Sequence, residues 1–163
     1  MNIKLLTQED WKSWKKIRLE ALKNVPEAFD SSFEEESLLS DENFIENLKR
    51  SNIFGAFNDS DIIGCVGFYV LPSNKIKHRG MLWGMYVKSE YRGKMAADSL
   101  LNAAIQHAKG SVIQLHLTCV TTNISAVKFY QKHGFKVYGT EPRSLKVNSQ
   151  FSDEFLMVLD LDK

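Results

Sequence analysis

The stretch "SEYRGKMAADSLLNAAIQHAKG", residues 89–110, joins a short basic turn to an alanine-rich amphipathic segment. Apolar and small residues recur in it at helical spacing: Ala97, Leu100, Leu101, Ala104, Ile105 and Ala108. The spacing predicts a helix that starts after the turn and ends at Gly110. Unpaired N–H groups and the helix dipole favour an anion at such a start, and Arg92 and Lys94 add positive charge. The turn therefore suits a phosphate or pyrophosphate, with a merely solvated loop as the alternative.

Strand patterns flank this helix on both sides. "GMLWGMYV" at 80–87 precedes it, and "SVIQLHLTCV" at 111–120 follows it. The second strand is predicted to bury one face, which carries Ile113, Leu115, Leu117 and Cys119. A strand, a helix and a strand in sequence favour a right-handed parallel crossover. Gly84 inside the first strand predicts a bulge or a close backbone approach, and the alternative is a packing glycine beneath Trp83.

The rest of the chain completes a mixed α/β domain, which we predict to span residues 1–163 as one unit. Further helices are expected over 8–24, 41–50 and 124–134, with a loop over 26–37. Further strands are expected over 3–6, 53–57, 62–71, 135–140 and 153–161, the last two bracketing a polar loop. The prediction is a twisted, largely antiparallel sheet of about seven strands flanked by about four helices.

Composition narrows the classes of function. The formal charge of +1 gives no electrostatic reason to expect a nucleic acid or an acidic membrane as partner. The amino terminus, MNIKLLTQED, has no apolar run of signal-peptide length, and no segment approaches the length of a membrane span, so we expect a cytoplasmic protein. Cys65 and Cys119 lack metal-ligand spacing and are expected to be reduced core thiols. The four histidines and the scattered acids give no metal site.

Two segments together carry a family resemblance. "YVKSEYRGKMAADSLL", followed some thirty residues later by "NISAVKFYQKHGF", resembles the paired motifs of the GNAT superfamily of acyl-CoA N-acyltransferases. In that family an R/Q-x-x-G-x-G/A loop holds the CoA pyrophosphate, and an N-x-x-A-x-x-x-Y-x-x-x-G-F segment lies against the pantetheine arm. The first motif maps onto Arg92, Gly93, Lys94, Met95, Ala96 and Ala97, and the second onto Asn123, Ala126, Tyr130, Gly134 and Phe135.

The resemblance implies an N-acetyltransferase with acetyl-CoA as its co-substrate. An acetyl group would pass to a primary amine, on a small molecule or a peptide, by direct attack in a ternary complex. The fold would contain one splayed parallel pair of strands, so that the backbone of Met85, Tyr86 and Val87 pairs with the pantetheine amides and a nearby N–H polarises the thioester carbonyl.

Met95 departs from the motif, because it stands at the first motif glycine. If that position has helical φ and ψ angles, methionine suits it, and the amides still face the phosphate. If it needs close backbone contact with the ligand, affinity suffers. Because the second small position, Ala97, is kept, we expect the methionine to be tolerated.

Tyr130 is the candidate catalytic residue. The CoA thiol has a pKa near 8.5, whereas a phenol near 10 stays protonated at neutral pH and can donate a proton to the leaving thiolate. The alternative is an aromatic residue on the buried face of its helix. Thr122 or Asn123 is expected to cap that helix, and for Asn123 capping is compatible with contacting the pantetheine.

The general base is not evident. Many family members place a glutamate on the strand before the loop, where this chain has Met81. The remaining candidates are Glu34, Glu35, Glu36, Glu141, Asp153 and Glu154, each expected to be a surface carboxylate rather than a base. Together they would make the amine entrance negative and favour a cationic acceptor.

A rival function fits the same cofactor motifs. A catalytically silent acyl-CoA-binding or regulatory module would keep the cofactor cleft and lack the base. The missing strand glutamate and Met95 favour this rival, whereas Tyr130 with Asn123 opposes it. A homodimer through sheet edges or the carboxy-terminal strands is plausible, and no residue pattern fixes it.

Overall fold

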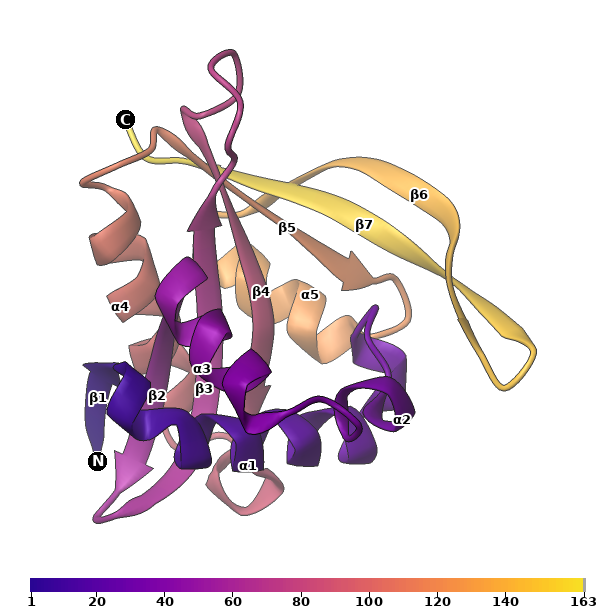
Figure 1. The fold of residues 1–163 in the computed structure, drawn as a ribbon. Helices are drawn as coiled ribbons and strands as arrows, with labels where there is room; N and C mark the ends of the chain where they lie inside the picture. Colours follow the sequence, from indigo (N-terminus) through magenta and orange to yellow (C-terminus); the bar gives the residue numbers. More distant parts are fainter. Residues whose placement is uncertain (163) are drawn as a thin grey trace.

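The computed structural model describes residues 1–162, which form one seven-stranded sheet flanked by helices (Figure 1). The strand order is β1-β2-β3-β4-β5-β7-β6, and only β4 and β5 run parallel. The strands are β1 Asn2–Leu5, β2 Asn52–Asn58, β3 Asp61–Val70, β4 Arg79–Val87, β5 Gln114–Val120, β6 Lys136–Val147 and β7 Gln150–Asp160. The predicted mixed sheet with one parallel pair is confirmed.

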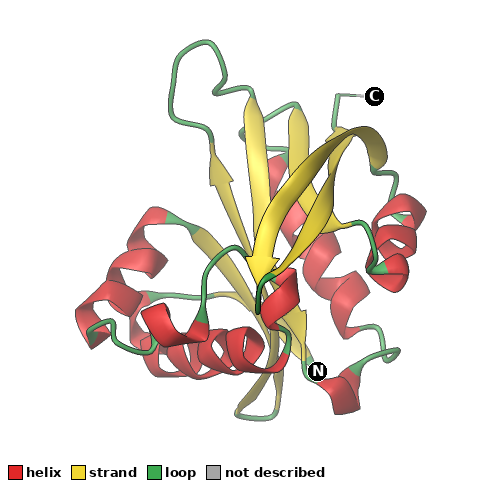
Figure 2. Cartoon of the chain, turned by 90° about the vertical axis from the view of Figure 1, so that its right-hand side faces the viewer, coloured by secondary structure: helices red, strands yellow, loops and turns green. Residues whose placement is uncertain are grey.

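Helices cover both faces of the sheet (Figure 2). They are α1 Trp11–Asn24, α2 Phe33–Glu36, α3 Asp41–Arg50, α4 Ala96–Ala108 and α5 Ile124–Lys132. The short helix α2 lies in the segment that we expected to be a loop. It forms because the Ser32 side chain accepts a hydrogen bond from the Glu35 N–H and caps the turn. Within residues 1–162, no helix is both long and apolar enough to cross a membrane.

The core divides into two clusters. One, which includes Leu100 and Leu101, packs α4 and α5 against the sheet, and the other, which includes Trp14 and Phe44, packs α1 and α3. Leu115, Leu117 and Cys119 of β5 join the α4–α5 cluster, as expected. Ile113 does not, since it precedes the first residue of β5 and is 47% exposed.

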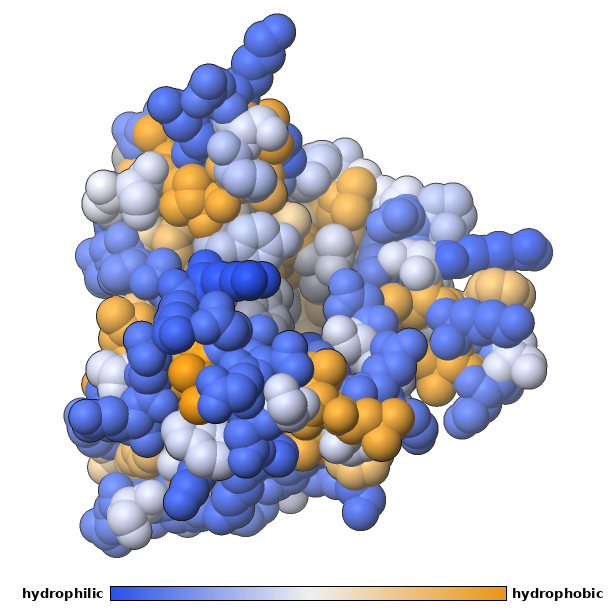
Figure 3. Space-filling view, viewed as in Figure 1, coloured by the Kyte–Doolittle hydropathy of each residue, from blue (hydrophilic) through white to orange (hydrophobic). Residues whose placement is uncertain are grey.

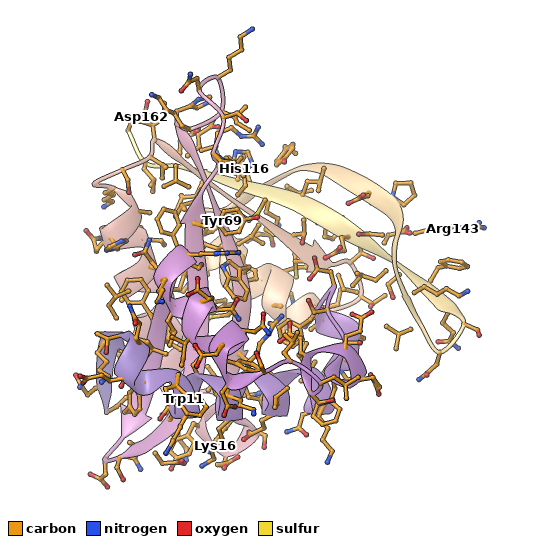
Figure 4. The ribbon with its side chains drawn as sticks, in the orientation of Figure 1. Trp11, Lys16, Tyr69, His116, Arg143 and Asp162 are labelled. Atoms are coloured by element: carbon orange, nitrogen blue, oxygen red, sulfur yellow. The ribbon has the colours of Figure 1, made fainter. Side chains whose placement is uncertain are left out.

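The two last strands form a longer hairpin than expected. The segment that we interpreted as a polar loop continues both strands to a turn at Asn148 and Ser149, with a register shift between Glu141 and Leu145. The exposed end of this arm extends away from the body of the protein, as Figure 1 shows, and Arg143 lies on it in Figure 4. Extended pairing satisfies the backbone of this segment even though most of its side chains are exposed.

Candidate active site

The parallel strands β4 and β5 separate soon after they meet. They pair from Arg79 with Gln114 to Met81 with His116, and β4 continues for six more residues without a partner on that edge. A cleft of about 600 Å³ opens between the separating strands. Figure 3, viewed as in Figure 1, shows that the surface is hollowed near the centre of the view. The expected splayed pair is therefore present, and its free edge borders a cavity.

Gly84 produces the expected bulge. One extra residue of β4 lies opposite β3 in the stretch around Gly84, whose φ is +65°. The alternative, a packing glycine beneath Trp83, is wrong for this position, because the glycine under that ring is Gly67. A Cβ atom at Gly67 would lie 2.3 Å from the indole, whereas one at Gly84 would meet only an Arg18 nitrogen at 3.5 Å.

Most of the residues predicted to bind the cofactor line this cleft. They are Met85, Tyr86, Val87, Arg92, Ala97, Asn123 and Ala126, and the predicted catalytic Tyr130 lines it as well. Gly93, Lys94, Met95 and Ala96 do not, since they form the turn between the lining residues Arg92 and Ala97. The motifs thus meet at one cavity, with the turn at its border.

The turn before α4 offers a row of backbone donors. The N–H groups of residues 93–98 make no hydrogen bond within residues 1–162, and the first bond of the helix runs from Ser99 N to Met95 O at 2.9 Å. Gly93 and Met95 both have left-handed φ angles, +72° and +66°. Successive free N–H groups at a helix N-terminus bind anions such as phosphate groups well.

The backbone at Met95 has a left-handed conformation. We expected the methionine to be tolerated there on the condition that its φ and ψ angles were helical, and they are not. Its φ of +66° and ψ of −5° suit the glycine that the motif has there, and its side chain adds strain of about 1–2 kcal/mol. The side chain itself is 71% exposed. The chain thus keeps the backbone shape of the motif at a cost in conformational energy.

Replacing Met95 with glycine should therefore stabilise the protein relative to replacing it with alanine. Met95→Ala keeps a Cβ atom in the left-handed conformation, whereas Met95→Gly removes it. We expect the glycine variant to exceed the alanine variant in free energy of unfolding by about 1 kcal/mol, measured by chemical denaturation. Equal stabilities would show that this position is not strained.

Arg92 lies between the turn and the free edge of β4. Its Nε donates to the Val87 carbonyl at 3.0 Å, and its guanidinium lies 5.8 Å from the centre of the Tyr86 ring. The Val87 carbonyl, expected to pair with pantetheine, thus already has a partner. Within residues 1–162 the two terminal nitrogens of the guanidinium have none and remain available to an anion.

Tyr130 lies on α5, whose start is fixed by Asn123. The Asn123 side chain accepts from the Ala126 N–H at 3.3 Å, so of the two expected candidates Asn123 is the cap. The Tyr130 ring packs edge-on against Phe129 and Phe135, and its hydroxyl has no hydrogen-bond partner among residues 1–162. Burial, and to a smaller extent the nearby Cys119, raises the pKa of the Tyr130 hydroxyl. The phenol is therefore protonated and free to donate.

Glu154 is the one candidate carboxylate whose position differs from our expectation. We expected a surface residue, but it is only 8% exposed and lines the cleft. Its carboxylate accepts a hydrogen bond from the Ser144 hydroxyl. Antiparallel pairing with β5 places Glu154 opposite Val120 and its neighbour Phe155 opposite Cys119. Because Cys119 and Phe155 pack in the α4–α5 cluster, alternation turns Glu154 to the other face of the sheet, the one that α1 covers.

The remaining candidate carboxylates lie elsewhere. Glu34, Glu35, Glu141 and Asp153 are exposed, as expected, and Glu36 is paired with Arg18. Cys119 lines the cleft as well, and burial raises the pKa of its thiol to about 11, so it is protonated at neutral pH. No group of His, Cys, Asp or Glu within residues 1–162 is arranged to hold a metal ion.

Arg18, Phe29 and Asp30 are among the lining residues that the sequence analysis did not single out. Arg18 did carry a signal, because it is a charged residue on the apolar face of a predicted helix. Phe29 and Asp30 lie in the connection after α1 and carry no motif. The sequence alone therefore did not indicate the α1 side of the cleft.

Comparison with known proteins identifies the family. The sequence profile of the Acetyltransferase (GNAT) family matches residues 11–135, and the chain belongs to this family of acetyltransferases. The chain is 25% identical over 125 residues to a spermine/spermidine N(1)-acetyltransferase of Bacillus subtilis (strain 168), a match that covers 72% of this chain and 77% of that protein. It is 26% identical over 101 residues to the L-amino acid N-acetyltransferase AaaT of Escherichia coli (strain K12), which covers 61% and 62%.

The fold agrees with solved structures. The Salmonella typhimurium protein yncA, solved with its cofactor acetyl-CoA, superposes with a TM-score of 0.86 at 16% identity. The superposition covers all of this chain and 95% of that one. The splayed sheet described above is therefore the fold of this family.

Proposed function

We propose that the protein transfers an acetyl group from acetyl-CoA to a primary amine, with residues 1–163 acting as one domain. The observation that carries the proposal is the continuity of the site. The unbonded N–H groups of the turn at 93–98 border a cleft whose lining includes Tyr130 and Glu154. An anion site, an acid and a base are the three parts that such a transfer needs.

The residues present fit acetyl-CoA. The N–H groups of residues 93–98 and the free guanidinium nitrogens of Arg92 would hold the pyrophosphate. The unpaired edge of β4 at Met85 would hold the pantetheine arm, with Asn123 and Ala126 across the cleft. The bound cofactor would supply a thioester for the amine to attack.

Tyr130 and Glu154 divide the proton transfers. Tyr130 lies on the α5 side and donates its proton to the departing sulfur; its raised pKa keeps the hydroxyl protonated until that step. Glu154 faces the α1 side and accepts a proton from the amine, directly or through water. A lysine-like amine with a pKa near 10.4 needs about 4.6 kcal/mol to lose its proton at pH 7, and a peptide α-amino group near 8 needs about 1.4 kcal/mol.

Glu154 also bears on the rival function. A silent acyl-CoA-binding module was suggested by the missing strand glutamate, since no base was evident. The buried carboxylate of Glu154 gives the cleft a candidate base from a different strand, β7. This observation supports an enzyme rather than a silent module.

Release of free thiol from acetyl-CoA tests the proposal. Purified protein is incubated with acetyl-CoA and a panel of amines that includes spermidine, amino acids and peptides, and acetylated products are identified by mass spectrometry. We expect thiol release that depends on an amine and matches the amount of acetylated product. Acetyl-CoA binding without transfer to any amine would favour the silent module.

Arg92→Ala should weaken acetyl-CoA binding about tenfold to a hundredfold, because it removes a charged hydrogen-bond donor to the pyrophosphate. Calorimetry on wild type and variant at two salt concentrations measures the loss, and acetyl-pantetheine, which lacks the pyrophosphate, serves as the control ligand. The variant should also show a smaller salt dependence. An unchanged affinity for acetyl-CoA would remove the pyrophosphate assignment.

A further inference from the structure

Arg18 places a buried cation on the α1 side of the cleft. We call this the acceptor side, because we expect the acceptor amine to bind there. Its side chain is 6% exposed, although it lies on the apolar face of α1. The guanidinium is held between two aromatic rings, 5.5 Å from the centre of Phe29 and 5.3 Å from that of Trp83. Burying a charge in this way is costly unless its hydrogen-bonding groups find partners.

Glu36 supplies only part of that partnership. Its carboxylate accepts from Arg18 Nε at 3.0 Å and from Nη2 at 2.8 Å, which makes a two-point ion pair. The other terminal nitrogen, Nη1, makes no hydrogen bond within residues 1–162. It is also the nearest atom to the position of a Cβ on Gly84, at 3.5 Å. The free donor therefore lies beside the bulge, where Arg18 and Gly84 both line the cleft.

The ion pair restricts what this donor can bind. Because Arg18 and Glu36 together are neutral, Nη1 offers hydrogen bonds without a large net charge. Such a donor binds an oxygen, either a carboxylate or a carbonyl, and offers nothing to an ammonium group. The acceptor side also holds the carboxylates of Glu154 and Asp30, which suit the amine itself. The cleft thus has one place for an amine and another for an oxygen acceptor.

We propose that Arg18 anchors the carboxyl or carbonyl oxygen of the acceptor, so that the preferred substrate is an α-amino acyl compound. The proposal rests on the proposed acetyl transfer and names its substrate class. Two sources share this chemistry, a free α-amino acid and the amino-terminal residue of a peptide. Apolar walls formed by Val25, Phe29, Tyr69 and Met81 favour an apolar side chain, and Tyr69 is labelled on β3 in Figure 4. A polyamine has no oxygen for Arg18 to hold.

A matched set of acceptors tests the proposal on the wild-type protein. The acceptors are L-phenylalanine, L-phenylalaninamide, 2-phenylethylamine, which lacks the carboxyl group, and spermidine. Values of kcat/KM are compared per neutral amine, because the four amines differ in pKa. We expect L-phenylalanine or its amide to exceed 2-phenylethylamine at least about tenfold. A higher kcat/KM for L-phenylalanine than for its amide indicates that the natural acceptor is a free amino acid. A higher value for the amide indicates the amino-terminal residue of a peptide.

A variant separates anchoring from folding. Arg18→Lys keeps the buried charge beside Glu36 but loses the planar fork that leaves Nη1 free. We expect KM for the better α-amino acyl acceptor to rise about tenfold, with KM for 2-phenylethylamine and the affinity for acetyl-CoA unchanged. A wild-type preference for 2-phenylethylamine or spermidine, no transfer to any of the four amines, or equal KM changes for all acceptors would overturn the inference. Failure of the proposed function is distinguishable, because the wider amine panel described above would then show no amine-dependent thiol release either.

Discussion

Tyr130→Phe should lower kcat about a hundredfold or more and leave the affinity for acetyl-CoA unchanged. The variant removes one hydroxyl, which has no hydrogen-bond partner among residues 1–162, and keeps the ring that packs against Phe129 and Phe135. A general acid contributes about 10²–10⁴-fold to such a step. Steady-state kinetics with an active amine and calorimetry with acetyl-CoA measure the two quantities separately.

The pH profile adds an independent check on Tyr130. Its hydroxyl donates only while protonated, and burial raises its pKa above the ordinary 10.0. Turnover in the wild type should therefore show no alkaline decline from this group up to at least pH 10. Phe129→Leu, at the neighbouring lining position, is the matched control and should lower kcat much less than the tyrosine variant. A Tyr130→Phe enzyme with wild-type turnover would remove this residue as the acid.

Glu154→Gln should lower kcat at pH 7 about a hundredfold, and the loss should shrink as the pH rises. The sign follows from the substrate, because a higher pH increases the fraction of amine that is already neutral and needs no base. The glutamine retains the hydrogen bond with Ser144 and the side-chain volume. Kinetics between pH 7 and pH 9.5 measure the convergence of variant and wild type.

Glu141→Gln is the control for this result. Glu141 lies opposite Glu154 in the β6–β7 hairpin and accepts from the same serine hydroxyl at 3.4 Å, but it is exposed. Its neutralisation should leave kcat within about twofold, since it does not line the cleft. A loss at Glu154→Gln that is independent of pH, or an equal loss in both variants, would exclude Glu154 as the base.

Local sequence signals predicted the fold well, and most of the residues that we expect to bind the cofactor line one cleft. The period of apolar residues fixed α4 and both of its flanking strands, and Asn123 caps α5 as expected. These features depend on residues close together in the chain, so the sequence pattern carries them directly. Homodimer formation and a cytoplasmic location stay predictions.

The acceptor side depended on long-range pairing and could not be predicted. Glu154 has an exposed carboxylate on either side of it in the hairpin, Asp153 along the strand and Glu141 across it, so only the pairing of β7 with β5 shows that it is buried. Arg18 meets Glu36 and Trp83 across separate elements. The expected helical conformation at Met95 was wrong for a different reason. Methionine is a residue type that suits a helix, so it does not indicate a left-handed φ angle.

A crystal structure with bound acetyl-CoA would test the central claim most directly. We predict that the pyrophosphate accepts hydrogen bonds from the N–H groups of residues 93–98. The thioester should lie in the cleft with its sulfur within hydrogen-bonding distance of the Tyr130 hydroxyl and with Glu154 on the opposite side of the sheet. A pyrophosphate bound away from this turn, or a sulfur outside the reach of Tyr130, would contradict the account.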